Sequence, residues 1–308
     1  MGILKPHIHI FCMEQKERPV IRGQVLTLGQ QAVYSTLHDV RSILGSHGIQ
    51  AKQLPQSFDT ATKIPGWKGT ENDRYTNAQS VLTLLGADNV YAADVSAYEN
   101  PDFLIDLNIP VSDSYHERFD TIVDAGTLEH CLDIRIALEN ICKMLKKGGS
   151  VVIITPCSNF IDHGFYSFSP TLFYDYFGSN GFANIGCYLR EGSPWILARK
   201  GRLFKYDRVG GQFPLVSKWA VEVAFVATKD KTYNSEELVK PVQAIYRNST
   251  SWNTDVTTTP NPHALTKLLR IKLFVSNGLS HMHKFYPFFV EKLIYGRRKT
   301  NLKYLGKY

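Results

Sequence analysis

Residues 119–156, FDTIVDAGTLEHCLDIRIALENICKMLKKGGSVVIITP, decide the fold class of this chain. Residues 119–123 and 151–155 are short apolar runs rich in β-branched side chains, typical of strands buried on both faces. Between them, apolar residues recur at helical spacing along one stripe, and Gly148-Gly149 supplies a C-terminal stop. We therefore expect a strand, a helical crossover and a parallel strand, which is the repeating unit of a doubly wound α/β sheet.

Further elements are predicted on both sides of this unit. We expect strands at 24–28, 89–93, 102–105, 184–189 and 219–228, helices at 30–44, 75–85 and 170–177, and a glycine-containing connection at 202–217. Residues 50–73 are polar and rich in turn residues, and a loop of this length is uncommon unless it works as a lid or binding loop. We place one domain at 1–232, with 50–73 as a lid-like insertion, and a mostly helical extension at 233–308.

The composition is that of an ordinary globular protein. Of the 308 residues, 44% are hydrophobic and 12% are aromatic, which is enough to bury a real core. The five cysteines are odd in number and lack CxxC spacing, so we expect reduced thiols and no zinc site. No apolar run approaches the roughly 20 residues that span a bilayer, and no signal peptide is evident. We expect a cytoplasmic protein.

The positive charge is concentrated in the last part of the chain. Residues 263–308 hold ten Lys and Arg and one Glu, a net charge of +9, so the preceding residues carry −2 of the overall +7. Helices packed on the domain would explain this tail, and so would peripheral contact with an anionic membrane or with glycan-assembly enzymes. Nucleic acid is the least favoured partner, because no recognition module accompanies the charge.

Three predicted strands end in a carboxylate, at Asp94, Asp106 and Asp124, and the first strand ends in a turn at Gly29. In an open parallel sheet, ligands bind beyond the carboxyl ends of the strands. An acid after the second strand suits ribose hydroxyls, and one after the third suits an adenine edge. Amide groups after the first strand suit a carboxylate. The alternative is that Asp terminates strands simply because it favours turns.

These motifs resemble class I S-adenosylmethionine-dependent methyltransferases. The resemblance rests on VLTLG at 25–29, NVYAADVS at 89–96, DFLIDLN at 102–108 and the stretch 119–156, in this order. It implies a Rossmann-like, mostly parallel sheet of seven strands whose last hairpin, 184–189 with 219–228, is reversed. It also implies S-adenosyl-L-methionine as cofactor. HGFYSFSP at 163–170 is similar to a block in methyltransferases associated with glycan biosynthesis.

The resemblance also implies which residues bind the cofactor. Carried over by position, they are Gly29, Gln30 and Gln31 for the methionine part, Asp94 and Val95 for the ribose, Asp106 and Leu107 for the adenine, and Asp124, Ala125 and Gly126 near the sulfonium. The family usually has several glycines after the first strand, and this chain has one. Glycine lets a backbone approach a ligand closely. Either the glutamine amides replace backbone contacts, or the cofactor is bound weakly.

Methylation of a hydroxyl requires positioning and a base. We assign the base to His163, with His130 as the second candidate and Tyr166 beside them. Histidine suits this role because its unperturbed pKa lies near neutrality. The alternatives are that His130 only opens the crossover helix and that His163 is a loop residue without a role. We expect no metal, because Glu129 is the single acid near Asp124.

Rival chemistries lack their signatures in this sequence. A nicotinamide dehydrogenase needs GxGxxG after the first strand, and this motif is missing. Methylation at cytosine carbon 5 needs a cysteine nucleophile, and although Cys157 is present, the second cysteine expected after the fourth strand is absent. We therefore expect O-methylation of a hydroxyl on a sugar or glycan precursor. The alternatives are methylation of another small molecule or of nucleic acid, and a non-catalytic scaffold that binds a partner enzyme through the tail.

Overall fold

The structure is a computed structural model, and it describes residues 2–55, 75–192, 201–208, 217–233, 238–247 and 302–307. The α-helices are α1 (Lys5–Glu17), α2 (Leu37–Ser46), α3 (Ala78–Leu85), α4 (Ile134–Met144), α5 (Pro170–Ser179) and α6 (Ala244–Arg247). The strands are β1 (Gly23–Leu28), β2 (Ala87–Asp94), β3 (Phe103–Leu104), β4 (Phe119–Ala125), β5 (Leu145–Ser158), β6 (Phe182–Gly192), β7 (Arg202–Tyr206), β8 (Ala220–Lys229) and β9 (Leu302–Lys307). Short 3₁₀ helices are η1 (Ala97–Glu99), η2 (Asp113–Tyr115) and η3 (Leu128–His130).

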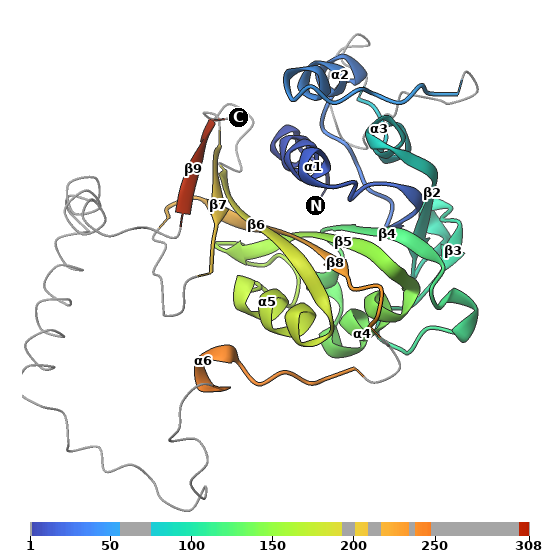
Figure 1. Cartoon of the computed structure of the whole chain (residues 1–308), viewed down its shortest axis with the longest axis vertical. Coiled ribbons are helices and arrows are strands. Elements are labelled where there is room, and N and C mark those ends of the chain that lie inside the picture. The colour runs from blue at the N-terminus through green and yellow to red at the C-terminus, as the bar shows by residue number, and fades with distance from the viewer. Residues whose placement is uncertain are drawn as a thin grey trace, which may run out of the picture.

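All of these strands belong to one sheet, in the order β3-β2-β1-β4-β5-β8-β6-β7-β9 (Figure 1). Strands β1 to β5 pair in parallel, whereas β8 is antiparallel to both of its neighbours, β5 and β6. This arrangement confirms the doubly wound α/β fold with a reversed last hairpin. The sheet has nine strands instead of the predicted seven, because β7 and β9 extend it beyond β6.

The two additional strands correct two predictions. Residues 202–206 were expected in a connection, and 302–307 in a mostly helical extension, yet the two segments pair with each other. Both carry basic side chains, which weaken an apolar strand pattern, and on β9, the edge strand, such side chains oppose aggregation. The rest of the predicted extension from residue 248 to 301, with most of the basic tail, lies outside the described residues, as does the lid-like insertion from residue 56 onward.

Helices cover both faces of the sheet, with α1, α2 and α3 on one side and α4 and α5 on the other (Figure 1). Two separate apolar cores result, and neighbouring residues of one strand supply both of them. Ile122 of β4 packs in the core that contains α4 and α5, whereas Val123 packs in the core that contains α1, α2 and α3. This double burial is why the central strands are almost continuously apolar in sequence.

The core on the side of α1, α2 and α3 contains a helix that the sequence pattern did not predict. Helix α1 buries His7 and Glu14 among its apolar residues, and this interrupts the amphipathic pattern. Each of the two polar groups has a buried partner on the sheet. His7 Nε2 lies 3.0 Å from Glu222 Oε2, and the Tyr188 hydroxyl donates to Glu14 Oε1 over 2.6 Å. Paired in this way, the polar groups can be buried without a large cost.

The turn after β1 also differs from the expectation. A helix was predicted from residue 30, but α2 begins at Leu37, where Thr36 accepts a hydrogen bond from the Asp39 amide and caps the helix. Residues 29–36 instead form a loop, held by bridges from Ile3 to Val33 and from Thr36 to Tyr75. Helix-opening amide groups therefore do not directly follow the first strand.

Among the described residues, no helix is both long and apolar enough to cross a membrane.

Candidate active site

The site lies at the carboxyl edge of the sheet, where β1, β2 and β4 end side by side. Leu28, the last residue of β1, is in register with Ala93 of β2 and Asp124 of β4. The Gly29 amide donates to the Ala93 carbonyl over 2.6 Å, and the Thr127 hydroxyl donates to the Leu28 carbonyl over 2.6 Å. The predicted convergence of strand ends is therefore present, and hydrogen bonds between the loops fix it.

Gly29 occupies the centre of this edge. Its φ of +77° is in the region that favours glycine, and a Cβ placed there would lie 3.0 Å from Thr127 Oγ1 and 3.8 Å from Asp94 Oδ2. The two glutamines that follow have hydrogen bonds within the chain. The Gln31 side-chain amide donates to the Leu28 carbonyl, and that of Gln30 donates to the Glu99 carbonyl over 3.4 Å. They stabilise this turn where further glycines would have made it flexible.

Asp94 and Asp106 each use one carboxylate oxygen locally. Oδ1 of Asp94 accepts from the Ser96 amide over 2.9 Å, and Oδ1 of Asp106 accepts from the backbone and side-chain nitrogens of Asn108 over 2.8 and 2.9 Å. Within the described part of the chain, Oδ2 of each has no hydrogen bond, and neither acid is paired with a Lys or Arg. Each acid is therefore held in orientation and has an oxygen available for a ligand hydroxyl or amine.

Asp124 is completely buried, and only one of its two carboxylate oxygens has a hydrogen bond among the described residues. Its Oδ1 accepts from the Thr127 amide over 2.9 Å, while Oδ2 is buried without a hydrogen-bond partner among the described residues. Burial, reinforced by the nearby Glu129 carboxylate, raises the pKa of Asp124 well above its usual value. A buried polar atom without a partner is costly, so this oxygen fits a site whose ligand supplies a donor or positive charge.

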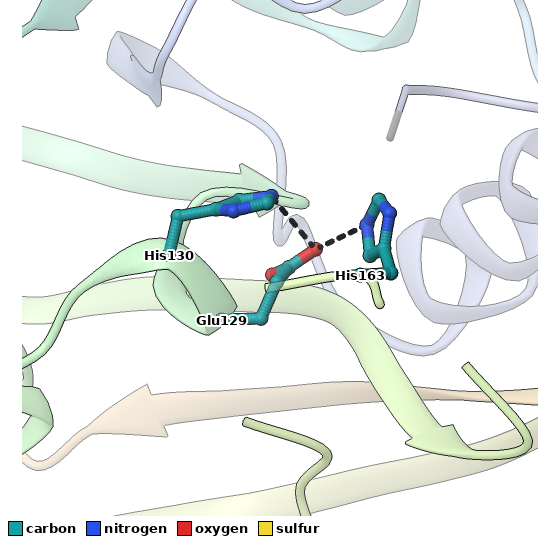
Figure 2. A group of neighbouring side chains, drawn as sticks. All are labelled: Glu129, His130 and His163. Carbon is teal, nitrogen blue, oxygen red and sulfur yellow. Dashed lines mark ion pairs between the residues drawn. The ribbon is translucent and has the colours of Figure 1, made fainter. Parts of the chain in front are cut away.

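Glu129 anchors a second group of residues, next to this edge. Its carboxylate is completely buried, and Oε2 accepts from the Thr155 hydroxyl over 2.9 Å. Its backbone carbonyl accepts from the amides of Phe165 and Tyr166 over 2.7 and 3.3 Å. The other oxygen, Oε1, faces His163 Nε2 at 3.4 Å and His130 Nε2 at 3.9 Å (Figure 2). We call Glu129, His130 and His163 the two-histidine cluster.

The structure thus brings both predicted histidines together and adds a residue that the sequence analysis did not assign. Glu129 and His130 lie in η3, a separate 3₁₀ turn before α4, and do not open the crossover helix as expected. The pair Glu129-His130 was the available signal in the sequence. Its connection to His163 depends on how the loop after β5 folds back, and no local pattern indicates that.

Tyr166 does not join the cluster through its hydroxyl, which donates to the Leu132 carbonyl over 2.8 Å. Among the aromatic residues around it, Phe168 is buried in the core, Phe165 is 65% exposed, and the ring of Phe160 lies 5.7 Å from that of His163. The other predicted binding residues are at the expected edge. Leu107 and Ala125 are buried, Val95 is exposed, and Gly126 has a φ of +107°.

Gly164 is the residue that lets His163 approach Glu129. Its φ is +72°, and a Cβ there would lie 2.8 Å from the Glu129 carbonyl oxygen and 2.9 Å from Glu129 Cγ. We expect Gly164→Ala to lower the free energy of unfolding by at least about 1–2 kcal/mol, measured by chemical denaturation. Gly178→Ala, at an exposed position of α5 with open space around it, is the matched control and should be neutral or slightly stabilising. Equal effects of the two changes would contradict this packing.

The cysteines near the site are poor nucleophiles. Burial raises the pKa of Cys157 to about 11, and burial together with the neighbouring acids Asp124, Asp106 and Glu129 raises the pKa of Cys131 to about 12. Both thiols therefore stay protonated at neutral pH, and the thiolate is the reactive form. All five cysteines are free in the structure.

Comparisons with known proteins give remote likenesses only. No protein-family model and no curated protein matches the sequence. Among solved structures, the CurJ carbon methyltransferase is 13% identical over 71% of this chain and 54% of its own, with a TM-score of 0.35. An S-adenosylmethionine-dependent methyltransferase from Archaeoglobus fulgidus is 10% identical over 73% and 94% of the two chains, also with a TM-score of 0.35.

A third solved structure is 1,6-didemethyltoxoflavin-N1-methyltransferase from Burkholderia thailandensis, which contains S-adenosylhomocysteine. It is 13% identical over 72% of this chain and 78% of its own, with a TM-score of 0.33. Likenesses at this level carry no argument about activity. The fold follows from the strand order, and the activity has to be inferred from the site.

Proposed function

We propose that this chain is an S-adenosylmethionine-dependent methyltransferase that methylates a hydroxyl group of a small-molecule acceptor. One observation carries the proposal. Asp94, Asp106 and Asp124 lie at the ends of successive strands around Gly29, in a sheet with the strand order and reversed strand that the resemblance implies. A turn role alone would account for the bonds of Asp94 and Asp106 to the amides two residues on, but not for the buried Asp124 oxygen that has no partner among the described residues.

The residues at this edge fit the cofactor. Asp94 would accept from the ribose hydroxyls, Asp106 from the adenine amine, and the Gly29 turn would lie against the methionine part. When bound, S-adenosylmethionine supplies a methyl group on a positively charged sulfur. Asp124 and Glu129, two buried acids without a Lys or Arg partner among the described residues, make this edge suited to a positive charge.

The acceptor end of the site is the two-histidine cluster. In the transfer, a bond forms between the acceptor oxygen and the methyl carbon, the bond from that carbon to sulfur breaks, and the acceptor proton leaves. We assign removal of this proton to the cluster, with His163 as its central residue, because its imidazole nitrogen lies 3.4 Å from the buried Glu129 carboxylate. The side chain of His163 is 34% exposed, so an acceptor can approach it.

For the acceptor we propose a sugar or a glycan precursor. The support is the resemblance of residues 163–170 to methyltransferases associated with glycan biosynthesis, together with the exposed ring of Phe165 directly beside the cluster. A flat apolar ring of this kind can pack against the face of a sugar, whose hydroxyls then point to polar groups at its rim. Contact of the basic tail with an anionic membrane or with glycan-assembly enzymes stays a prediction from the sequence.

Transfer of an isotopically labelled methyl group tests the proposal. The purified chain, labelled S-adenosylmethionine and a set of sugar nucleotides and oligosaccharides are incubated, and products are searched by mass spectrometry for the gain of one labelled methyl. We expect S-adenosylhomocysteine and one methylated product in equal amounts. Methylation of a non-sugar metabolite would correct the acceptor class. If the chain binds the cofactor but transfers no methyl group to any acceptor tested, a non-catalytic scaffold is favoured.

A further inference from the structure

The two-histidine cluster has the composition of a metal site. Glu129, His130 and His163 each offer one ligand atom, and these three atoms lie within 4.8 Å of one another. Figure 2 shows both imidazole Nε2 atoms turned toward the same carboxylate oxygen, Oε1 of Glu129. Three donor atoms from the turn after β4 and the loop after β5 thus converge on one point.

Hydrogen bonding does not account for this convergence. Glu129 Oε1 and His163 Nε2 are both buried, and neither atom has a hydrogen-bond partner within the described chain, although they lie 3.4 Å apart. A completely buried carboxylate oxygen without a donor is costly. By contrast, Oε2 of the same carboxylate has a good bond from Thr155. An ion between the three side chains would satisfy both unpartnered atoms.

The spacing also suits an ion. Ligand atoms about 2.0–2.2 Å from a tetrahedral Zn²⁺ lie about 3.3–3.6 Å from each other. Oε1 of Glu129 lies 3.4 Å from His163 Nε2, within this range, and 3.9 Å from His130 Nε2, so His130 has to move closer to bind the same ion. The His130 side chain is 51% exposed and free to adjust, whereas Glu129 is held by Thr155 and by the backbone of 165–166.

We propose that Glu129, His130 and His163 bind one divalent transition-metal ion, of the Zn²⁺ class. Two imidazoles and one carboxylate select first-row ions over Mg²⁺ and Ca²⁺, which prefer oxygen ligands. Thr155 is the supporting contact that orients the carboxylate. This proposal departs from our expectation from the sequence, which considered Glu129 without the two histidines and predicted no metal.

The consequence of the ion rests on the proposed function. Three protein ligands leave a fourth position of the ion for an acceptor, and the side chains of His130 and His163 are 51% and 34% exposed. An acceptor hydroxyl bound there loses its proton to water more readily, because a bound divalent ion strongly lowers the pKa of a coordinated oxygen. His163 then acts as a ligand, and the charge of the ion ionises the acceptor.

Titration of the full-length chain, stripped of metal and without a histidine tag, tests the site. Calorimetry with Zn²⁺ should give one ion per chain, and Co²⁺ should give visible absorption bands of a low-symmetry site. His130→Ala and His163→Ala should each weaken Zn²⁺ binding by more than about 100-fold, since changes to the supporting contacts alone typically cost 10–100-fold. Mg²⁺ should not compete. His130 is exposed, so its loss should leave the fold intact.

Two control variants exclude other histidines. His38→Ala removes an exposed imidazole of α2, and His47→Ala breaks the one other close contact between histidine nitrogens in the described chain, His9 Nδ1 to His47 Nε2 at 2.8 Å. Both should bind Zn²⁺ as the unchanged chain does. The proposal is overturned if no ion binds, or if the cluster variants bind as tightly as the controls.

The same samples are titrated with S-adenosylhomocysteine, which separates this inference from the proposed function. If the chain binds S-adenosylhomocysteine but does not bind Zn²⁺, the metal site is overturned and the methyltransferase proposal stands. If it binds Zn²⁺ but does not bind S-adenosylhomocysteine, the metal site stands and the methyltransferase proposal is overturned.

Discussion

His163→Ala should lower the rate of methyl transfer by about 10²–10⁴-fold and leave the affinity for S-adenosylhomocysteine nearly unchanged. This is the usual contribution of a positioned group that handles a proton. The imidazole lies against Glu129 at the acceptor end of the site, whereas the residues assigned to the cofactor lie at the ends of β1, β2 and β4 and in the segment after β3. Single-turnover rates and calorimetry on the same protein measure the two quantities.

His38→Ala is the matched control for this change. It removes an exposed imidazole on α2 and should keep the full rate. His130→Ala completes the series, because His130 faces the same carboxylate oxygen from a greater distance. If His130→Ala causes the loss and His163→Ala has none, the roles of the two histidines are exchanged. If neither change matters, the cluster does not take part in the reaction.

Asp94→Ala should weaken the binding of S-adenosylhomocysteine by at least about 100-fold. A hydrogen bond to a charged group contributes about 1.5–3 kcal/mol, and a ribose diol would lose more than one such bond. Asp94 is half-buried at the end of β2, and one of its oxygens is already bound by the Ser96 amide, so its orientation is fixed before the ligand arrives.

Asp88→Ala is the control for the cofactor prediction. Asp88 belongs to the same strand but lies at its opposite end, exposed and paired with Lys52. Its loss should leave the affinity for S-adenosylhomocysteine unchanged, and it should cost little stability because an exposed ion pair contributes little. An equal effect of both changes would mean that Asp94 acts through the stability of β2 and not through the ligand.

The central part of the fold could be predicted from the sequence because its strands are buried on both faces. The run 119–123 is apolar or β-branched at every position but Asp120, as double burial favours, and β4 covers it. Helix α1 and strands β7 and β9 could not be found in this way. Buried polar residues such as His7 interrupt the pattern of α1, and basic residues interrupt the patterns of β7 and β9.

The same distinction holds for the site. Gly29, Asp94, Asp106 and Asp124 lie at or within two residues of strand ends, so strand prediction places them, and these strand ends do meet at one edge. The two-histidine cluster depends on a contact between segments far apart in sequence. The backbone amides of 165–166 bond to the Glu129 carbonyl, and Gly164 permits the approach. No periodicity in the sequence reports such a contact.

Titration of the purified full-length chain with S-adenosylhomocysteine tests the central claim most directly. We predict saturable binding of one molecule per chain and a higher melting temperature, since a ligand at 100 times its dissociation constant adds about 2.7 kcal/mol to the stability of the folded state. A folded chain that shows neither heat of binding nor a shift in melting temperature at millimolar ligand would contradict the account.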